Sequence, residues 1–438
     1  MHFYSRARVP LACLPKTLAA GVTGKNLPFE PWLECDILVD GTRITEVTAA
    51  GAKPAPPDGK TAVTDLGGAL VWPGMLDVHT HLDKTHTWDR APNPTGEFWD
   101  AMGPLHHDSR LWTEEDLYRR ASFAMRTAWA HGTVAVRTHL DSGGTVGAAG
   151  HAVMQRLRAE WADRITLQTV SLCNLQAFVD GQAKQIMELT ASGHATAFGG
   201  FPQPNPDLPR QLDYLMAAAC ELGIGLDLHV DESALAHAEC LRATAEAVLR
   251  NQFPHPVACG HNCSLAVQDL ARAAETIALV KQAGISIISL PLCNLYLQGR
   301  SRAAPDRPQT PRWRGVTLLH EFMDAGVTVA CASDNVRDAF YAWGDYDAME
   351  VYAQSVRIAH LDTRLSASPA VVTTGPAAIM GLPDHGCIAP GARADLVVME
   401  ARTFSELLSR PAGRRRLFRG EHVRDAVVPD YSELGVTT

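Results

Sequence analysis

Two histidines one residue apart end an apolar run in the first fifth of the chain. The run starts at Val71 and ends in His79-Thr80-His81. Side chains two positions apart on a β-strand point to the same face, so both imidazoles can reach one metal ion at about 2.0–2.1 Å. The pair alone leaves two interpretations open, a metal-binding pair or two incidental histidines.

Three later apolar runs end in a possible metal ligand in the same way. Their last polar residues are His229, His261 and Asp334, and Glu232 follows three residues after the first of them. Each of these side chains lies where a buried strand would stop. Four such coincidences favour a shared metal site over isolated polar residues.

The composition excludes several classes of partner. The chain has 438 residues, 46% of them hydrophobic and 20% charged, with a formal net charge of −9. An acidic chain without an extended basic patch is not expected to bind nucleic acid or an anionic membrane. Arg414-Arg415-Arg416 is the only dense basic run, and we interpret it as a solvated turn or helix end.

The cysteines and the N-terminal residues bear on the compartment. Ten cysteines are scattered without a repeated spacing, several inside apolar runs, which is typical of reduced core residues in the cytoplasm. Cys259 and Cys263 flank His261, but no second thiol pair at structural-zinc spacing accompanies them. Pro10 and Pro15 interrupt the first residues, and no run of about 18 apolar residues occurs, so neither a signal peptide nor a membrane span is expected.

The elements that must position these side chains alternate between short apolar strands and amphipathic helices. We expect eight strands, at residues 70–82, 133–140, 165–172, 195–201, 223–230, 256–262, 285–291 and 327–334. Helical periodicity is clearest at 113–131, 208–222, 233–251 and 266–283. This order predicts an α/β fold, a (β/α)8 TIM barrel, whose functional residues collect at the carboxyl ends of the strands.

The two ends of the chain have a different pattern. Short β-like pieces precede residue 66, and a turn followed by a strand returns after residue 386. We therefore expect a small β-sandwich domain built from both chain ends, with segments 1–66 and 379–438 flanking a metal-dependent barrel of residues 67–378.

An ordered series of motifs resembles the amidohydrolase superfamily and, within it, the bacterial cytosine deaminase group. The motif His-x-His-Leu-Asp begins at His79, Arg-Thr-His-x-Asp begins at Arg137, and His-x-Asp-Glu begins at His229. A glutamine on the third strand matches Gln168. A loop motif, Asn-x-x-Leu-Gln-Gly-Arg, follows at 294–300 with an Arg-Gly pair at 314–315.

The resemblance implies a metal-dependent hydrolytic deaminase of an amino-substituted heterocycle. It implies one divalent metal, Zn²⁺ or Fe²⁺, held by His79, His81, His229 and Asp334. Ammonia would leave after attack by a metal-bound hydroxide, since the metal lowers the pKa of water toward about 7. As catalytic residues, Glu232 would move the proton, His261 would hydrogen-bond the hydroxide and the tetrahedral oxyanion, and Asp334 would orient the water.

The resemblance also suggests substrate contacts. Gln168 would hydrogen-bond the ring and Phe98 would approach it, while His139 and Asp141 would support the metal-binding histidines. Asn335 replaces the group's second aspartate, and Phe340 replaces its tryptophan. Because an amide can donate as well as accept, a carbonyl or a larger substituent is favoured at the position of Asn335. Cytosine is the leading substrate only, with isoguanine, 5-methylcytosine, isocytosine, creatinine and aminotriazines as alternatives.

Two rival functions remain to be considered. A two-metal cyclic amidase of the same superfamily opens a ring amide and usually bridges its metals with a carboxylated lysine on the fourth strand. The only lysines after Lys84 are Lys184 and Lys281, both in helical patterns, so this bridge has no candidate. A non-catalytic binding protein would not need all four ligands and Glu232. We expect a cytoplasmic homo-oligomer acting on a small heterocycle and water.

Overall fold

The computed structural model describes residues 1–20, 22, 28–53, 59–300, 309–413, 415–420, 422–423 and 427–435. The chain divides into two compact units. One, the β unit, comprises Met1–Asp77, Thr127–Val134 and Asp347–Val428. The other, the barrel unit, comprises Val78–Arg126, Ala135–Tyr346 and Pro429–Thr438. The predicted domain limits at 66/67 and 378/379 stay a prediction about where the barrel begins and ends.

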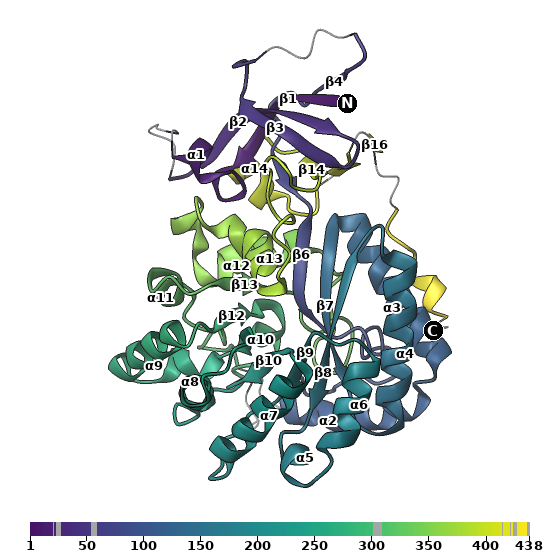
Figure 1. The fold of residues 1–438 in the computed structure, drawn as a ribbon, viewed down its shortest axis with the longest axis vertical. Helices are drawn as coiled ribbons and strands as arrows, with labels where there is room; N and C mark the ends of the chain where they lie inside the picture. Colours follow the sequence, from purple (N-terminus) through teal and green to yellow (C-terminus); the bar gives the residue numbers. More distant parts are fainter. Residues whose placement is uncertain are drawn as a thin grey trace. The chain divides into compact units, whose positions relative to one another are not determined.

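Eight parallel strands form the barrel sheet, and their order in the sheet follows the chain (Figure 1). They are β6 (Met75–Thr80), β7 (Thr133–Asp141), β8 (Thr166–Cys173), β9 (Ala197–Gly200), β10 (Gly225–Val230), β11 (Val257–His261), β12 (Ser286–Ser289) and β13 (Val329–Cys331). A bridge between Thr80 and Asp334 joins the first strand to the segment after the last. The predicted (β/α)8 barrel is confirmed, and each predicted strand overlaps an observed one.

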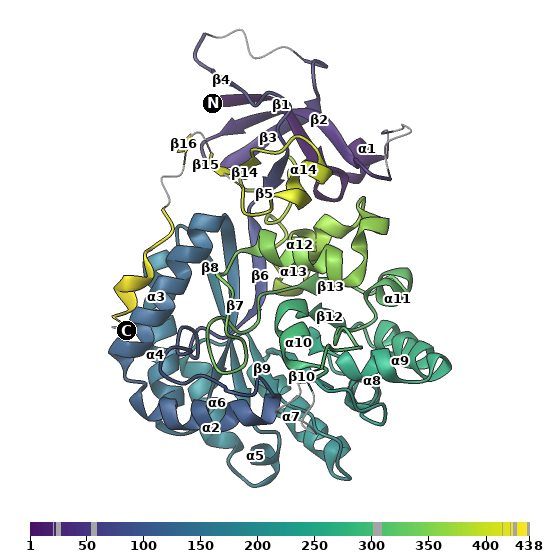
Figure 2. The same cartoon turned by 180° about the vertical axis from the view of Figure 1, so that it is seen from behind.

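Helices cover the outside of the strands, as α4, α7, α8 and α9 show in both views (Figures 1 and 2). The barrel unit contains α2 (Phe98–Asp108), α4 (Gly144–Trp161), α5 (Gln176–Val179), α6 (Ala183–Ser192), α7 (Leu208–Leu222), α8 (Cys240–Asn251), α9 (Leu270–Gln282), α10 (Pro291–Leu297) and α11 (Leu319–Asp324), and α3 (Glu114–His131) ends in the β unit. None of the helices that the structure describes is long and apolar enough to cross a membrane.

Two predicted helices start later than expected because aspartates cap them. The Asp231 carboxylate accepts hydrogen bonds from the backbone N–H groups of Cys240 at 3.1 Å and Leu241 at 2.9 Å, so α8 begins at Cys240 and not at residue 233. Asp269 caps α9 in the same way, and that helix begins at Leu270 and not at residue 266. These caps leave the residues after His229 and His261 free to form the loops of the site.

The β unit holds two four-stranded sheets. The first contains β1 (His2–Pro10), β2 (Trp32–Asp40), β3 (Arg43–Ala49) and β4 (Ala62–Asp65); the second contains β5 (Val71–Pro73), β14 (Asp395–Met399), β15 (Arg415–Arg419) and β16 (His422–Val423). One hydrophobic core includes Ile37 from the first sheet and Val71, Leu396 and Phe418 from the second. Both chain ends therefore build the predicted β-sandwich. Short helices α1 (Lys16–Ala19), α12 (Ala348–Ala359), α13 (Thr374–Met380) and α14 (Phe404–Ser409) complete this unit.

The predicted first strand is in fact two strands separated by Gly74. β5 pairs with β14 in the sandwich, whereas β6 belongs to the barrel sheet. A Cβ atom at Gly74 would lie 2.5 Å from Cγ1 and 2.8 Å from Cγ2 of Val134. The Val134 side chain thus occupies the space that a side chain at position 74 would need.

We expect Gly74→Ala to lower the free energy of unfolding by about 1–3 kcal/mol, because the methyl group forces Val134 or the backbone to move. Urea unfolding followed by circular dichroism measures this change. Gly103→Ala is the matched control: Gly103 lies inside α2 with nothing within 4 Å of a Cβ atom, so that variant should be neutral or more stable. Equal stability of the two variants would contradict the packing argument.

Candidate metal and active site

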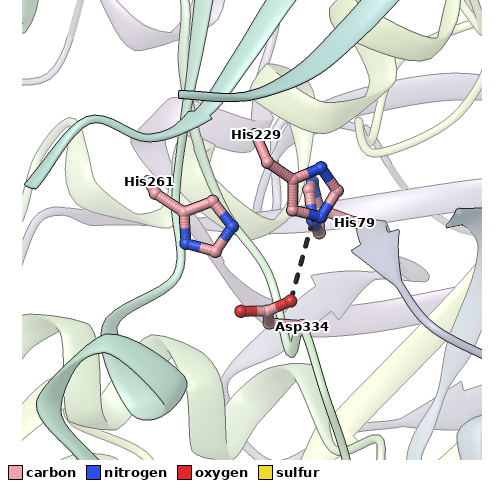
Figure 3. A group of neighbouring side chains, drawn as sticks. All are labelled: His79, His229, His261 and Asp334. Atoms are coloured by element: carbon pink, nitrogen blue, oxygen red, sulfur yellow. Dashed lines mark hydrogen bonds and ion pairs between the residues drawn. The ribbon is translucent and has the colours of Figure 1, made fainter. Parts of the chain in front are cut away.

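His79, His229, His261 and Asp334, which come from distant parts of the chain, converge at the strand ends (Figure 3). The Nε2 atom of His229 lies 3.1 Å from Nε2 of His79 and 3.1 Å from Nε2 of His81. Oδ1 of Asp334 lies 3.3 Å from Nε2 of His81 and 3.7 Å from Nε2 of His79. The structure thus brings together all four predicted metal ligands.

The buried atoms of this cluster fit a divalent cation. Both carboxylate oxygens of Asp334 are buried and have no hydrogen-bond donor of acceptable geometry. Burial lowers the pKa of His79 and of His229 well below the usual value, so both rings are neutral, which is the form that binds metals. Burying a charged carboxylate beside neutral imidazole nitrogens raises the free energy of the folded state unless a cation compensates the charge. Three imidazoles and one carboxylate suit zinc or iron.

The fourth barrel strand argues against a two-metal arrangement bridged by lysine. β9 consists of Ala197-Phe198-Gly199-Gly200 and contains no lysine. The structure places both Lys184 on α6 and Lys281 on α9, as the sequence predicted. β9 therefore offers no lysine that could bridge two metals.

A second layer of polar groups lies behind His79. Oδ1 of Asp227 is 3.9 Å from Nδ1 of His79 and 3.6 Å from Nε2 of His139, while Nη1 of Arg137 donates to Asp227 Oδ2 at 2.9 Å. Burial raises the pKa of Asp227 to about 6, although Arg137 opposes the shift. His139, predicted to support the ligands, packs its ring 4.0 Å from the His79 ring. Asp227 was not among the predicted site residues. Its position inside an apolar strand, two residues before His229, was the signal that could have identified it.

Glu232 and His261 form a hydrogen-bonded group beside the cluster. Glu232 Oε1 lies 3.2 Å from His261 Nδ1, and the Asn294 amide Nδ2 is 3.1 Å from Glu232 Oε1 and 2.9 Å from His261 Nδ1. Burial raises the pKa of Glu232. The pKa of His261 is also raised, because the charges of Glu232 and Asp334 outweigh its burial. An acid held in this way can exchange a proton within the site.

A cavity of about 1060 Å³ opens above the cluster. Its lining contains most of the predicted site residues: His81, Phe98, Asp141, His229, Glu232, His261, Asn335 and Phe340. The cavity is at the upper end of the range of about 300–1,000 Å³ found for small-molecule sites. A ligand larger than one six-membered ring can therefore be enclosed.

Gln168 does not join this group. It lies near the beginning of β8, in register with Arg137, and its Oε1 accepts hydrogen bonds from Nε of Arg137 at 3.0 Å and from Nη2 at 2.8 Å. Asn174, directly after the end of β8, lines the cavity instead. Its position immediately after a predicted strand was the signal that could have identified it.

Asp141 contacts a lysine that the sequence analysis did not assign to the site. Lys84 Nζ lies 2.7 Å from Asp141 Oδ2 and 3.4 Å from Asp83 Oδ2, and Lys84 lines the cavity. Burial lowers the pKa of Lys84, but Asp141 and Asp83 raise it to about 12, so the amine is charged. Asp141, predicted to support the histidines, is thus placed on a buried cation at the cavity wall.

The Asn335 amide has a fixed orientation. Its Nδ2 donates to Asp338 Oδ2 at 2.7 Å, and Asp338 Oδ1 accepts from the backbone N–H of Phe340 at 2.9 Å. The sequence analysis expected Asn335 to offer a donor to the substrate. Asp338 takes one N–H of the amide, so the second N–H and Oδ1, which lies 3.9 Å from Cys293 Sγ, are the polar groups that remain.

Known proteins agree with this architecture. The model of the amidohydrolase family matches residues 95–423. The chain is 46% identical over 424 residues to the pterin deaminase of Rhizobium rhizogenes, covering 97% of this chain and 94% of that protein. It is 24% identical over 352 residues to N-isopropylammelide isopropyl amidohydrolase of Pseudomonas sp., covering 77% and 81%.

A solved structure has the same fold. The 5-methylcytosine deaminase of Klebsiella pneumoniae, liganded with 5-fluorocytosine, superposes with a TM-score of 0.81 at 24% identity, covering 98% of this chain and 99% of that one. The histidine cluster at the strand ends, the barrel and the match over most of the length lead to one conclusion. The chain belongs to the amidohydrolase family and is a hydrolase that acts on C–N bonds.

Proposed function

We propose that this enzyme is a metal-dependent deaminase of pterins. Water would replace the exocyclic amine on C2 of the ring, giving the 2-oxo product and ammonia. The observation that carries this proposal is the 46% identity to a pterin deaminase over 97% of the chain. The cavity supports it, because its volume of about 1060 Å³ leaves room for a two-ring substrate with a substituent.

Cytosine, the substrate expected from the sequence, has weaker support. The likeness to 5-methylcytosine deaminase is at 24% identity, which establishes the fold and no substrate. Asn335 and Phe340 also depart from the cytosine deaminase pattern at the cavity wall. The reaction type stays as predicted, and the proposed ring changes from a pyrimidine to a pteridine.

The residues of the site suit hydrolytic removal of an amine. A divalent metal held by His79, His81, His229 and Asp334 would lower the pKa of water and so supply hydroxide at neutral pH. Glu232 would take one proton from the attacking water and deliver it to a ring nitrogen, and would then carry the second proton, that of the new C2 hydroxyl, to the leaving amine. A C2–O bond would form and the C2–N bond to the amine would break, so that ammonia leaves with the second proton and the product keeps C2=O and the ring N–H.

His261 would interact with the oxygen that adds to C2, and Asn335 would interact with the amine that leaves. His261, held through Nδ1 by Glu232 and Asn294, has a buried Nε2 without a hydrogen-bond partner. This nitrogen is suited to stabilise the oxygen that adds to C2. The Oδ1 atom of Asn335 would accept a hydrogen bond from the amine. Zn²⁺ or Fe²⁺ is the proposed metal, and a cytoplasmic homo-oligomer remains a prediction.

Glu232→Gln should lower the turnover of pterin by about 10²–10⁴-fold, because the amide cannot take a proton from water. Ammonia release measured with a coupled assay gives the rate, and elemental analysis should still find one metal per chain. Glu239→Gln is the matched control on an exposed surface, where Glu239 pairs with Arg272. Near-normal turnover by Glu232→Gln would contradict its role as the proton carrier.

His79→Ala should lose the metal and the activity together, because it removes one of four ligands from a buried site. Metal content by elemental analysis is the measurement. His151→Ala serves as the control, since His151 is buried but hydrogen-bonds Ser142 away from the four ligands. Retention of one tightly bound metal per chain by His79→Ala would mean that the metal lies elsewhere.

The ring itself can be identified by kcat/KM for ammonia release from pterin, cytosine, 5-methylcytosine, isoguanine and creatinine. We expect pterin to exceed cytosine by at least about 100-fold, since a site shaped for a larger ring loses contacts with a smaller one. Preference for cytosine would reject the pterin proposal and keep the deaminase mechanism. Ring opening without ammonia release would favour the cyclic amidase.

A further inference from the structure

The lining of the cavity changes in character from the barrel to its mouth. Among the lining residues that the structure describes, the histidine, lysine and carboxylate side chains all lie at or just beyond the carboxyl ends of barrel strands; these are His81, Lys84, Asp141, His229, Glu232 and His261. The part contributed by α2 and α6 contains no ionisable side chain. We call this part the outer wall and define it as Trp99, Met102, Leu105, Gln185, Ile186 and Leu189.

The outer wall presents large apolar side chains that nothing in the described chain covers fully. Trp99 is 62% exposed and Met102 is 44% exposed, and both line the cavity. The helices α2 and α6 lie near each other in both views, so their side chains can face a common ligand (Figures 1 and 2). An exposed apolar surface within a cavity is typical of a binding site for an apolar group.

Aromatic rings connect the outer wall to the reaction site. Phe340, two residues beyond Asp338, lies 5.4 Å from Phe98, and Phe98 lies 5.1 Å from Trp99 with an interplanar angle of 85°. The Trp99 ring is thus contacted by the edge-to-face neighbour Phe98 and is otherwise largely open. A flat ligand that begins at the metal cluster meets aromatic surface along its whole length.

We infer that the outer wall is a subsite for an uncharged aryl or alkyl substituent on C6 of the pteridine, and this inference rests on the proposed function. With C2 at the strand ends, the fused second ring extends away from the barrel, whose interior is filled by side chains. The substituent on that ring would then pack on Trp99, Met102 and Ile186. The preferred substrates are pterins that carry such a group.

The charges around the cavity oppose an anionic substituent. Lys84 is the only lysine or arginine among the described lining residues, and Asp141 and Asp83 already pair with it. A carboxylate at the outer wall would lose water without gaining a cation. Glutamines at this wall, such as Gln185, can still hydrogen-bond neutral polar groups.

The test compares kcat/KM of the metal-loaded enzyme for pterin, 6-phenylpterin and 6-carboxypterin. We expect 6-phenylpterin to exceed pterin by about 10-fold, and 6-carboxypterin to fall below pterin. Trp99→Ala and Ile186→Asp should each lower the ratio of 6-phenylpterin to pterin by about 5-fold, and Trp99→Phe should restore most of it. Tyr214→Ala, which removes an exposed ring on α7 outside the cavity, should leave the ratio unchanged.

Binding to Glu232→Gln separates this inference from the proposed function. Fluorescence titration of that variant with pterin and with 6-phenylpterin gives the two dissociation constants without turnover. Tighter binding of 6-phenylpterin that Trp99→Ala abolishes supports the subsite even if ammonia release is slow. Equal binding of both ligands, or a ratio that Trp99→Ala does not change, overturns the subsite while pterin turnover still upholds the deaminase. Absence of binding and turnover for all three ligands overturns both.

Discussion

The buried carboxylate of Asp334 is the constraint on which the rest of the site depends. Neither of its oxygens has a hydrogen-bond donor of acceptable geometry, and the Nε2 atoms of His79 and His81 lie 3.7 Å and 3.3 Å from Oδ1; burial lowers the pKa of His79. A charge in this position is stable only beside a cation. The buried carboxylate and imidazoles are therefore suited to a divalent cation. Folding of the strand ends and metal binding are expected to be coupled.

The closure of the barrel brings Asp334 next to His79. The backbone N–H of Asp334 donates to the carbonyl oxygen of His79 at 2.9 Å, so the hydrogen bond that joins the two ends of the barrel sheet also joins two ligands. Asp334 and His261 both have positive φ, 63° and 68°, a conformation that is unfavourable for residues other than glycine. Each turns the chain sharply just beyond its strand and aims a side chain across the barrel end.

The position of the polar cluster could be predicted because its residues lie at the ends of apolar runs. The strand order follows from the alternation of strands and helices, whereas the assignment of four of these residues as metal ligands rests on the family motifs and remains a prediction. Gln168 shows a limit of prediction from motifs. A motif match does not say how far along its strand a residue lies, and Gln168 lies near the beginning of β8, hydrogen-bonded to Arg137. Asn174 was missed because it belongs to the turn. The starts of α8 and α9 depend on aspartate caps that periodicity alone does not reveal.

Asn335 explains how one neutral residue can suit this site better than a second carboxylate. Asp338 fixes its amide, so Oδ1 can accept a hydrogen bond from the leaving amine as an aspartate would. An aspartate at this position would add a negative charge close to Glu232 and Asp334 and would repel both carboxylates. Asn335 avoids this repulsion. Burial raises the pKa of Asp338 to about 6. Asn335 would stand between the Asp338 carboxylate and the substrate. Asn335 thus offers a hydrogen-bond acceptor without placing a further negative charge at its own position.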